Sequence, residues 1–201
     1  MDIKDCLSLL LFLIFIFSYL GKLMILKNKH KIQANVLAKA KTDFIVRITE
    51  AFVKLTTFIW GVMWFSLSVS ESLISHWINP LVRNDLLSSL GILVMALGLA
   101  VFIVAMISMK TSWRVGIDKG TKSSLVTEGI YRFTRNPAFV GFDLMFIGLF
   151  VTYPYILTFG IVVLNIMAIH CLILQEEKHL KTTFSEEYLK YFSNTKRYII
   201  F

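Results

Sequence analysis

The sequence predicts an all-α integral membrane protein with five transmembrane helices, and three observations support this fold class. Hydrophobic residues make up 56% of the 201-residue chain and charged residues only 17%, whereas a soluble domain usually carries about 25% charge. The apolar residues gather in five runs, with most Lys and Arg in the gaps between them. Backbone groups inside hydrocarbon must be satisfied within their own segment, so each run is expected to be helical. The length suits a single membrane domain, residues 1–201.

The predicted spans cover about residues 7–26, 52–69, 86–109, 138–152 and 155–174. The fourth is short for a span of roughly 20 residues. Only Tyr153 and Pro154 separate it from the fifth, which predicts a tight helical hairpin between the two. Trp60 and Trp64 fall on one face of the second span. After the fifth span, apolar residues spaced by four predict a cytoplasmic amphipathic helix, and Ser185 is expected to break it.

Basic residues predict the orientation of the chain. The segments Lys22–Lys54, Lys110–Arg135 and 175–201 hold eight, six and five Lys and Arg, whereas Glu71–Asp85 holds one. Positive residues favour the cytoplasmic side, so the N-terminus should lie outside and the C-terminus in the cytoplasm, across an inner or plasma membrane. The net charge of +8 then indicates membrane lipids as partners and no nucleic acid. The basic segment Lys27–Arg47 is either an interfacial helix or a solvated linker.

Several charged residues are candidates for chemistry. Glu176 and Glu177 stand at the mouth of the fifth span, where one could face the bundle and accept hydrogen bonds from a ligand ammonium group. The alternative is an ordinary pair of charges at a helix exit. Asp143 lies within the fourth span and is expected to face a polar cavity or to pair with Arg135. Arg114, Arg132, Arg135 and Arg197 either meet an anionic group or anchor the chain at the membrane.

Other positions have a structural expectation. Asn136 precedes Pro137 and should cap the fourth helix. Cys6 and Cys171 lie in or beside apolar runs, so we expect buried thiols with no disulfide and no metal. The sequence contains no GxGxxG after a strand, no P-loop and no Cys/His cluster, which excludes a soluble nucleotide-binding fold.

An ordered set of motifs in roughly the last ninety residues resembles a known family. The set is LVTEGIYRFTRNPAFVG (Leu125–Gly141), the hairpin, QEEKHL, FSEEYLKY and Arg197, and SWRVGID (Ser112–Asp118) precedes it. The set is similar to the membrane methyltransferases related to isoprenylcysteine carboxyl methyltransferase and phospholipid methyltransferase, and SWRVGID resembles their bacterial branch.

The resemblance implies a cytoplasmic S-adenosylmethionine pocket built by about residues 112–201. A strand-like Ser123–Val126 backbone and Tyr131 would border the adenosine, and Glu176 would hold the methionine ammonium group. The implied cofactor-binding residues are Ser123, Ser124, Leu125, Val126, Tyr131, Asn136, Pro137, Ala138, Phe139 and Glu176. The implied catalytic residues are Arg197 and Arg114, near the reacting end, and Glu177.

This chain departs from the family pattern at two positions. The Arg-His-Pro-x-Tyr of the family becomes Arg-Asn-Pro-Ala-Phe at 135–139, which removes a titratable group at Asn136 and a hydroxyl at Phe139. Methyl transfer depends mainly on alignment, so these losses exclude proton transfer at Asn136 but not cofactor binding. A carboxylate or thiolate acceptor needs no base, whereas an amine would need one, for which Glu177, His179 and Tyr131 are candidates.

The expected acceptor is lipid-like or a small hydrophobic molecule. Gly141 and Gly148 recur on one helix face, where they either open the bundle towards lipid or allow close helix packing. Two other functions stay open at this point. One is a membrane reductase of isoprenoid or sterol type that uses NADPH, and the other is a non-catalytic membrane module, suggested by the replacements at Asn136 and Phe139.

Overall fold

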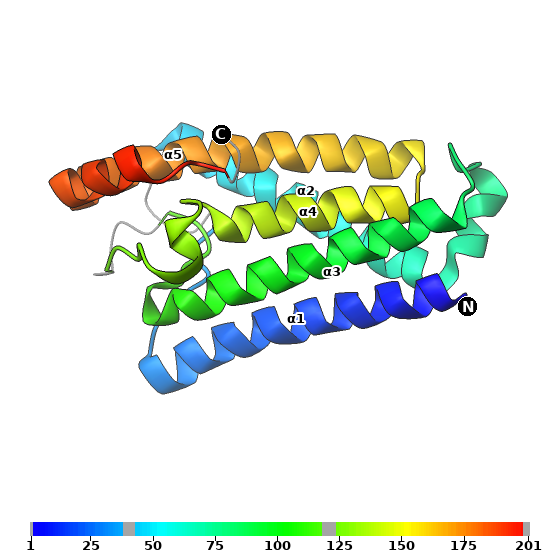
Figure 1. Ribbon diagram of the computed structural model, residues 1–201, viewed down its shortest axis with the longest axis horizontal. Coiled ribbons are helices and arrows are strands. Elements are labelled where there is room, and N and C mark those ends of the chain that lie inside the picture. Colours follow the sequence, from blue (N-terminus) through cyan, green and yellow to red (C-terminus); the bar gives the residue numbers. More distant parts are fainter. Residues whose placement is uncertain (1, 38–42, 118–123, 199–201) are drawn as a thin grey trace.

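The computed structural model describes residues 2–37, 43–117 and 124–198. Five α-helices run along the long axis of the molecule and alternate in direction (Figure 1). They are α1 (Ile3–His30), α2 (Phe44–Trp77), α3 (Asp85–Ser108), α4 (Pro137–Thr152) and α5 (Ile156–Asn194). Two short 3₁₀ turns, η1 (Lys110–Ser112) and η2 (Gly129–Arg132), lie between α3 and α4. The described part of the chain contains no strand, only an isolated bridge between Asn35 and Val115, so the all-helical prediction is confirmed.

Four helices are long and apolar enough to cross a membrane: α1, residues Phe44–Ser72 of α2, α3 and α5. The protein is therefore an integral membrane protein by the length and composition of its helices. The 16 residues of α4 reach only about 24 Å at 1.5 Å per residue, less than the roughly 30 Å of hydrocarbon in a bilayer. That α4 forms an additional membrane span, and that α4 and α5 form a hairpin of two spans, stay predictions.

Helix α4 packs closely against α3 through glycines. A Cβ atom added at Gly98 would lie 2.7 Å from the Gly141 carbonyl oxygen, and one at Gly148 would lie 2.6 Å from the Met95 nitrogen. The two backbones can approach this closely only because no side chain stands between them. The glycines of α4 therefore serve helix packing, and the alternative of a lateral opening at Gly141 and Gly148 is wrong.

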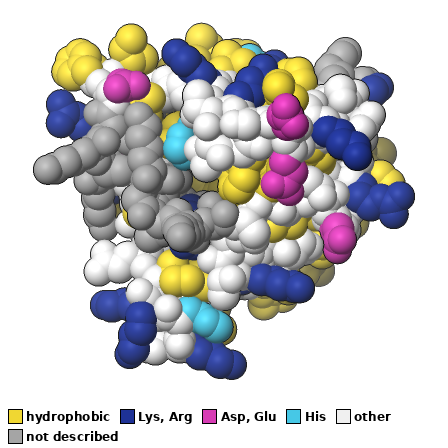
Figure 2. Space-filling model, turned by 90° about the vertical axis from the view of Figure 1, so that its left-hand side faces the viewer, with side chains coloured by type: hydrophobic (Ala, Val, Ile, Leu, Met, Phe, Trp, Pro, Cys, Tyr) yellow, Lys and Arg dark blue, Asp and Glu magenta, His cyan; other side chains and the backbone are white. Residues whose placement is uncertain are grey.

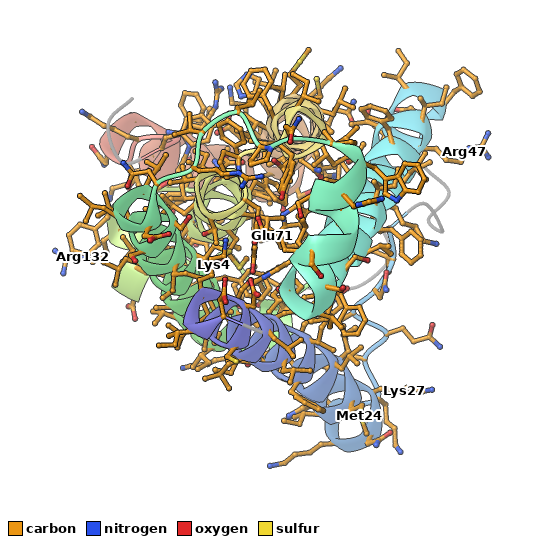
Figure 3. The ribbon with its side chains drawn as sticks, turned by 90° about the vertical axis from the view of Figure 1, so that its right-hand side faces the viewer. Lys4, Met24, Lys27, Arg47, Glu71 and Arg132 are labelled. Atoms are coloured by element: carbon orange, nitrogen blue, oxygen red, sulfur yellow. The ribbon has the colours of Figure 1, made fainter. Side chains whose placement is uncertain are left out.

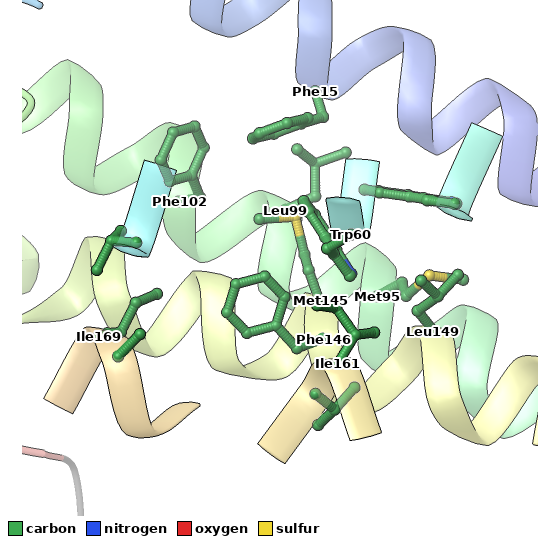
Figure 4. Packing of buried hydrophobic residues seen from close by; sticks show 14 of the residues in the cluster. Phe15, Trp60, Met95, Leu99, Phe102, Met145, Phe146, Leu149, Ile161 and Ile169 are labelled. Carbon is green, nitrogen blue, oxygen red and sulfur yellow. The ribbon is translucent and has the colours of Figure 1, made fainter. Parts of the chain in front are cut away.

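Aromatic side chains fill the centre of the bundle (Figure 4). Trp60 and Trp64 of α2 are 1% and 0% exposed, so the helix face that they share points into the bundle. The ring centroids of Trp60 and Phe146 lie 4.8 Å apart, edge to face, and those of Phe102 and Phe142 lie 4.9 Å apart. These contacts join α2, α3 and α4 into one core.

Helix α5 continues without interruption from its apolar half into the polar tail, as predicted. Its backbone leaves helical geometry at Ser185, where φ is 44° and ψ is −116°, so the predicted break is confirmed. Helix α2 has a similar irregularity at Ser70. Residues 31–37 are not helical, so the interfacial-helix alternative fails for that part, and residues 38–42 of the same segment lie outside the described residues.

The expectation of buried cysteines is wrong, because Cys6 and Cys171 are both free and exposed. Both lie on parts of α1 and α5 whose outer faces are apolar, as shown by exposed Leu7, Leu10 and Leu174. In a membrane protein an apolar environment is available outside the bundle as well as inside it, so hydrophobic context alone does not predict burial.

The end of the bundle that carries the N-terminus is held by polar contacts. The Lys4 ammonium lies 2.6 Å from Glu71, and the Tyr155 hydroxyl donates to the same carboxylate at 2.9 Å. Figure 3 looks onto this end and shows Lys4 and Glu71 between the ends of α1 and α2. The Tyr153 hydroxyl donates to Asp5 at 3.0 Å. The α4–α5 connection is therefore fixed to both N-terminal helices.

Candidate active site

A cavity of about 710 Å³ lies at the opposite end of the bundle, where the α1–α2 and α3–α4 connections meet the polar part of α5. Lys and Arg side chains surround this end of the molecule (Figure 2). The inner wall carries polar side chains from four segments: Arg114, Tyr131, Asn136 and Glu176. The arrangement brings together residues that lie far apart in the sequence around one space large enough for a small ligand.

Most of the predicted cofactor-binding residues line this cavity. They are Ser124, Leu125, Val126, Tyr131, Asn136, Ala138, Phe139 and Glu176, together with the predicted catalytic Arg114. Pro137 is buried at the start of α4 and is not a lining residue. Ser123 lies outside the described residues. Residues 124–126 form no paired strand, and the strand-like course of Ser123–Val126 stays a prediction.

The two adjacent glutamates of α5 have different roles. Glu176 faces the cavity, whereas Glu177 is 4% exposed and points away from it towards two arginines. The expectation that one carboxylate faces the bundle interior is met by Glu176. Glu177 is not an ordinary solvated charge at a helix exit, because Arg135 and Arg197 bind its carboxylate.

Glu177 bridges the loop before α4 and the segment after α5. Arg135 donates from Nη2 to Oε1 at 2.8 Å and from Nε to the same oxygen at 3.2 Å. Arg197 donates from Nη2 to Oε2 at 2.8 Å. These hydrogen bonds raise the pKa of the Arg197 guanidinium above its usual value. Both carboxylate oxygens are therefore engaged by permanently charged donors. We call these three residues the glutamate bridge.

Further hydrogen bonds join the same two segments. The Arg197 carbonyl accepts from the Thr134 hydroxyl at 2.7 Å and from Asn136 Nδ2 at 3.2 Å. The Arg135 amide donates to the Lys196 carbonyl at 2.8 Å. Asn136 is the N-cap residue of α4, as predicted, yet its side chain makes no capping hydrogen bond. Its amide instead fixes the chain after α5 against the start of α4.

Neither Glu177 nor Arg197 lines the cavity. The structure places them behind the wall that Asn136 and Glu176 form, where they hold two wall segments together. Arg114 does line the cavity, and its Nη1 donates to the carbonyls of Thr111 and Trp113. Arg114 therefore lies among the predicted cofactor-binding residues. Glu177 and Arg197, the other two predicted catalytic residues, lie behind the cavity wall.

The cavity wall contains buried polar atoms that sequence reasoning missed. Trp60 Nε1, Trp113 Nε1 and the Tyr188 hydroxyl are buried and have no hydrogen-bond partner among the described residues. Buried donors left without a partner cost free energy, so such groups usually meet a ligand or water. Trp113 lies within the SWRVGID motif, which was a usable signal, whereas nothing in the sequence marks Trp60 or Tyr188 as wall residues.

The cavity continues as an apolar branch between α1 and α2. Its walls there include Phe12 and Tyr19 of α1 and Phe58, Val62 and Phe65 of α2. Phe58 and Phe65 are 68% and 47% exposed on the outside of the bundle. The branch therefore reaches a surface that is apolar enough to face lipid.

Asp143 does not belong to this cavity. The predicted pair with Arg135 is wrong, because Arg135 is turned towards Glu177. One carboxylate oxygen of Asp143 is buried without a hydrogen-bond partner among the described residues. Near the same part of the molecule the Tyr198 hydroxyl lies 2.7 Å from His170 Nδ1.

The fold and the cavity define a class: a helical membrane protein with a polar site at one end of the bundle and an apolar branch leading towards lipid. Comparison with known families identifies the chain further. The model of the phospholipid methyltransferase family matches residues 86–187, which cover half of the sequence. The chain belongs to this family and is a methyltransferase that acts on a membrane substrate. No curated protein matched the chain.

The family match supports methyl transfer and gives no support to the NADPH reductase. In the part of the chain that the structure describes, no group of three or more His, Cys, Asp or Glu could hold a metal ion. The expectation that no metal takes part stays a prediction.

Proposed function

We propose that this protein transfers the methyl group of S-adenosylmethionine to an acceptor with an apolar tail at the cytoplasmic face of the membrane. The observation that carries the proposal is the single cavity that joins a polar wall, which contains Glu176, to the apolar branch between α1 and α2. A water-soluble cofactor and a lipid-embedded acceptor could meet there without either leaving its own phase. The cytoplasmic orientation follows from the basic residues at this end.

The wall residues suit the proposed cofactor. The Glu176 carboxylate can accept hydrogen bonds from the ammonium of its methionine part. The unpartnered Trp113 Nε1 and Tyr188 hydroxyl offer further polar contacts, while Leu125, Val126 and Phe139 offer apolar surface to the adenine ring. On this reading about residues 112–201 form the cofactor-binding part of one membrane domain.

When bound, S-adenosylmethionine supplies an electrophilic methyl group on a sulfonium, which is a good leaving group. The protein has to align the acceptor with the methyl carbon and to exclude water. Arg114 and Lys54 line the cavity and would attract a negatively charged acceptor group. The bound cofactor would supply the methyl group and a neutral thioether as leaving group, while Arg114 and Lys54 would hold the acceptor group in place. A carboxylate or thiolate acceptor releases no proton in this step.

These charges favour a carboxylate or thiol acceptor over an amine. An amine would have to lose a proton near the cavity, and Glu177 is held by two arginines. His179 lines the cavity and is the candidate base for that case. Burial raises the pKa of the Tyr131 hydroxyl well above its usual value, so Tyr131 is not a base near neutral pH.

The test uses purified full-length protein and calorimetric titration with S-adenosylmethionine. Methyl-labelled cofactor is then supplied with vesicles that carry phosphatidylethanolamine, a long-chain fatty acid, a prenylated cysteine or an alkyl thiol. We expect cofactor binding and label in a carboxylate or thiol acceptor. Absence of cofactor binding would overturn the proposal, and a rise in Tm with NADPH but not with S-adenosylmethionine would favour the reductase instead.

A further inference from the structure

Glu50 of α2 is a buried carboxylate that no part of the proposed chemistry uses. Its residue is 0% exposed, and it lies outside the segment that matches the family model, residues 86–187. A carboxylate in such a position is stable only when it is well hydrogen-bonded. Its Oε1 accepts from the Ile117 amide at 2.7 Å. Glu50 therefore holds the backbone of the α3–α4 connection.

The contact between Glu50 and this connection depends on a glycine. Gly116 has φ of +94°, and a Cβ atom at this position would lie 2.9 Å from Glu50 Oε1 and 2.8 Å from the Leu37 Cα. Only glycine adopts this backbone geometry readily and leaves room for both neighbours. The Glu50 carboxylate thus lies directly against the main chain of residues 116 and 117.

The same segment is also held on its other side. The Val115 amide donates to the Ala34 carbonyl at 2.8 Å, and the Val36 amide donates to the Val115 carbonyl at 3.0 Å. Residues 113–117 therefore lie between the α1–α2 connection and Glu50. All five residues of this segment line the cavity, including Trp113 and Arg114, so the position of its backbone sets theirs.

The region around Glu50 also touches the part of α5 that carries Glu176. The neighbouring Thr49 hydroxyl accepts from Gln175 Nε2 at 2.8 Å. The Glu50 carboxylate acts electrostatically on that of Glu176. One turn of α2 therefore contacts two of the segments that form the polar wall, the Trp113–Ile117 segment and the start of the polar part of α5.

We infer that Glu50 is a positioning residue: by accepting from the Ile117 amide it fixes the Trp113–Ile117 segment so that Arg114 faces the cavity beside Glu176. The expected effect of Glu50 on cofactor binding rests on the proposed function, because the segment that Glu50 fixes is part of the proposed cofactor wall. Glu50 itself does not line the cavity and would not touch the reactants. The family model covers only residues 86–187, so it gives no indication of a role for Glu50.

The test measures amide hydrogen exchange at 113–117 in the cofactor-free, full-length protein. Glu50→Ala removes the acceptor and should speed exchange of the Ile117 amide roughly tenfold, as expected for the loss of one buried hydrogen bond. Glu50→Gln retains an oxygen at the same reach and should restore exchange to within about twofold of the wild type. The matched control is Glu71→Ala, which removes a hydrogen-bonded carboxylate at the other end of α2 and should leave exchange at 113–117 unchanged.

A second measurement separates positioning from general stability. Glu50→Ala should weaken S-adenosylmethionine binding several-fold, whereas Glu71→Ala should lower Tm without changing the Kd. If Glu50→Ala does not fold, Glu50→Asp tests the same contact with a shorter side chain and should also speed exchange. Equal exchange at 113–117 in the Glu50 and Glu71 variants would overturn the inference. Failure of the wild type to bind the cofactor would overturn the proposed function alone, since the exchange result does not depend on it.

Discussion

Replacing Glu177 with alanine should weaken the attachment of the segment after α5 to the start of α4, although the hydrogen bonds to the Lys196 and Arg197 carbonyls remain. Glu177 is 4% exposed and accepts hydrogen bonds from Arg135 and Arg197, each with a shortest distance of 2.8 Å. The substitution removes the shared acceptor and leaves two guanidinium groups that previously faced one carboxylate. The glutamate bridge can then no longer join the two segments.

The two arginines contribute unequally to the expected cost. The Arg135 side chain is 7% exposed, and loss of one partner from a buried pair costs about 3–5 kcal/mol. The Arg197 side chain is 31% exposed, so its share is closer to the roughly 0–1 kcal/mol of a solvated pair. Arg135 would keep its hydrogen bond to the Phe192 carbonyl at 3.2 Å and its place over the Phe192 ring. We therefore expect a cost near the lower limit, about 3 kcal/mol.

A cost of about 3 kcal/mol raises the population of molecules in which the segment after α5 is detached from α4 by about a hundredfold. Limited proteolysis at Lys196 measures that population, and denaturant unfolding in detergent measures any global loss. The control is Glu187→Ala, which removes an exposed carboxylate from the same helix and should change the free energy of unfolding by less than about 0.5 kcal/mol. If Glu177→Ala is cleaved at Lys196 no faster than Glu187→Ala, the bridge does not hold the segment and the reasoning fails.

Three further predictions concern other parts of the fold and site. Gly98→Ala places a methyl group against the backbone of α4 and should lower the free energy of unfolding by about 1–3 kcal/mol. The control is Gly160→Ala, whose added Cβ has no atom within 4 Å. This control should leave the free energy of unfolding unchanged or raise it. Glu176→Gln should weaken S-adenosylmethionine binding by about 1.5–3 kcal/mol, as measured by calorimetric titration. The Tm of the cofactor-free protein should change little. An unchanged Kd would mean that Glu176 does not belong to the proposed site. Ser185→Gly should raise the free energy of unfolding by about 1 kcal/mol, because φ of 44° strains any residue with a Cβ; a decrease would mean that the Ser185 side chain stabilises the kink.

The helices were predictable because each is marked by its own composition. Apolar runs locate α1, α3 and the first half of α5, and the Pro137 that begins α4 is a local signal. The ends of α2 were less predictable, since the helix extends from Phe44 to Trp77 while its apolar run covers only about residues 52–69. The additional turns are stabilised by contacts with other helices, such as the one between Glu71 and Lys4, and no local pattern records those contacts.

The candidate site was predictable only in part. The motif order placed Glu176 and Asn136 in one region, and both line the cavity. The resemblance assigned Glu176 to the cofactor and Glu177 to catalysis, but it did not show that Glu177 faces away from the cavity, because adjacent residues on a helix differ mainly in the direction they face. Which of them meets Arg135 and Arg197 depends on how the chain returns after α5, which is a tertiary property. The unpartnered Trp60 indole was also beyond prediction, since its sequence context is that of any core residue.

The glutamate bridge has a consequence for how the chain tolerates shortening. Arg135 and Glu177 both lie before the end of α5, whereas Arg197 lies after it. A chain cut directly after α5 would therefore keep the buried carboxylate paired with Arg135 but lose Arg197 and the carbonyl that accepts from Thr134 and Asn136. Ligand binding should then be more sensitive to this truncation than formation of the helical bundle.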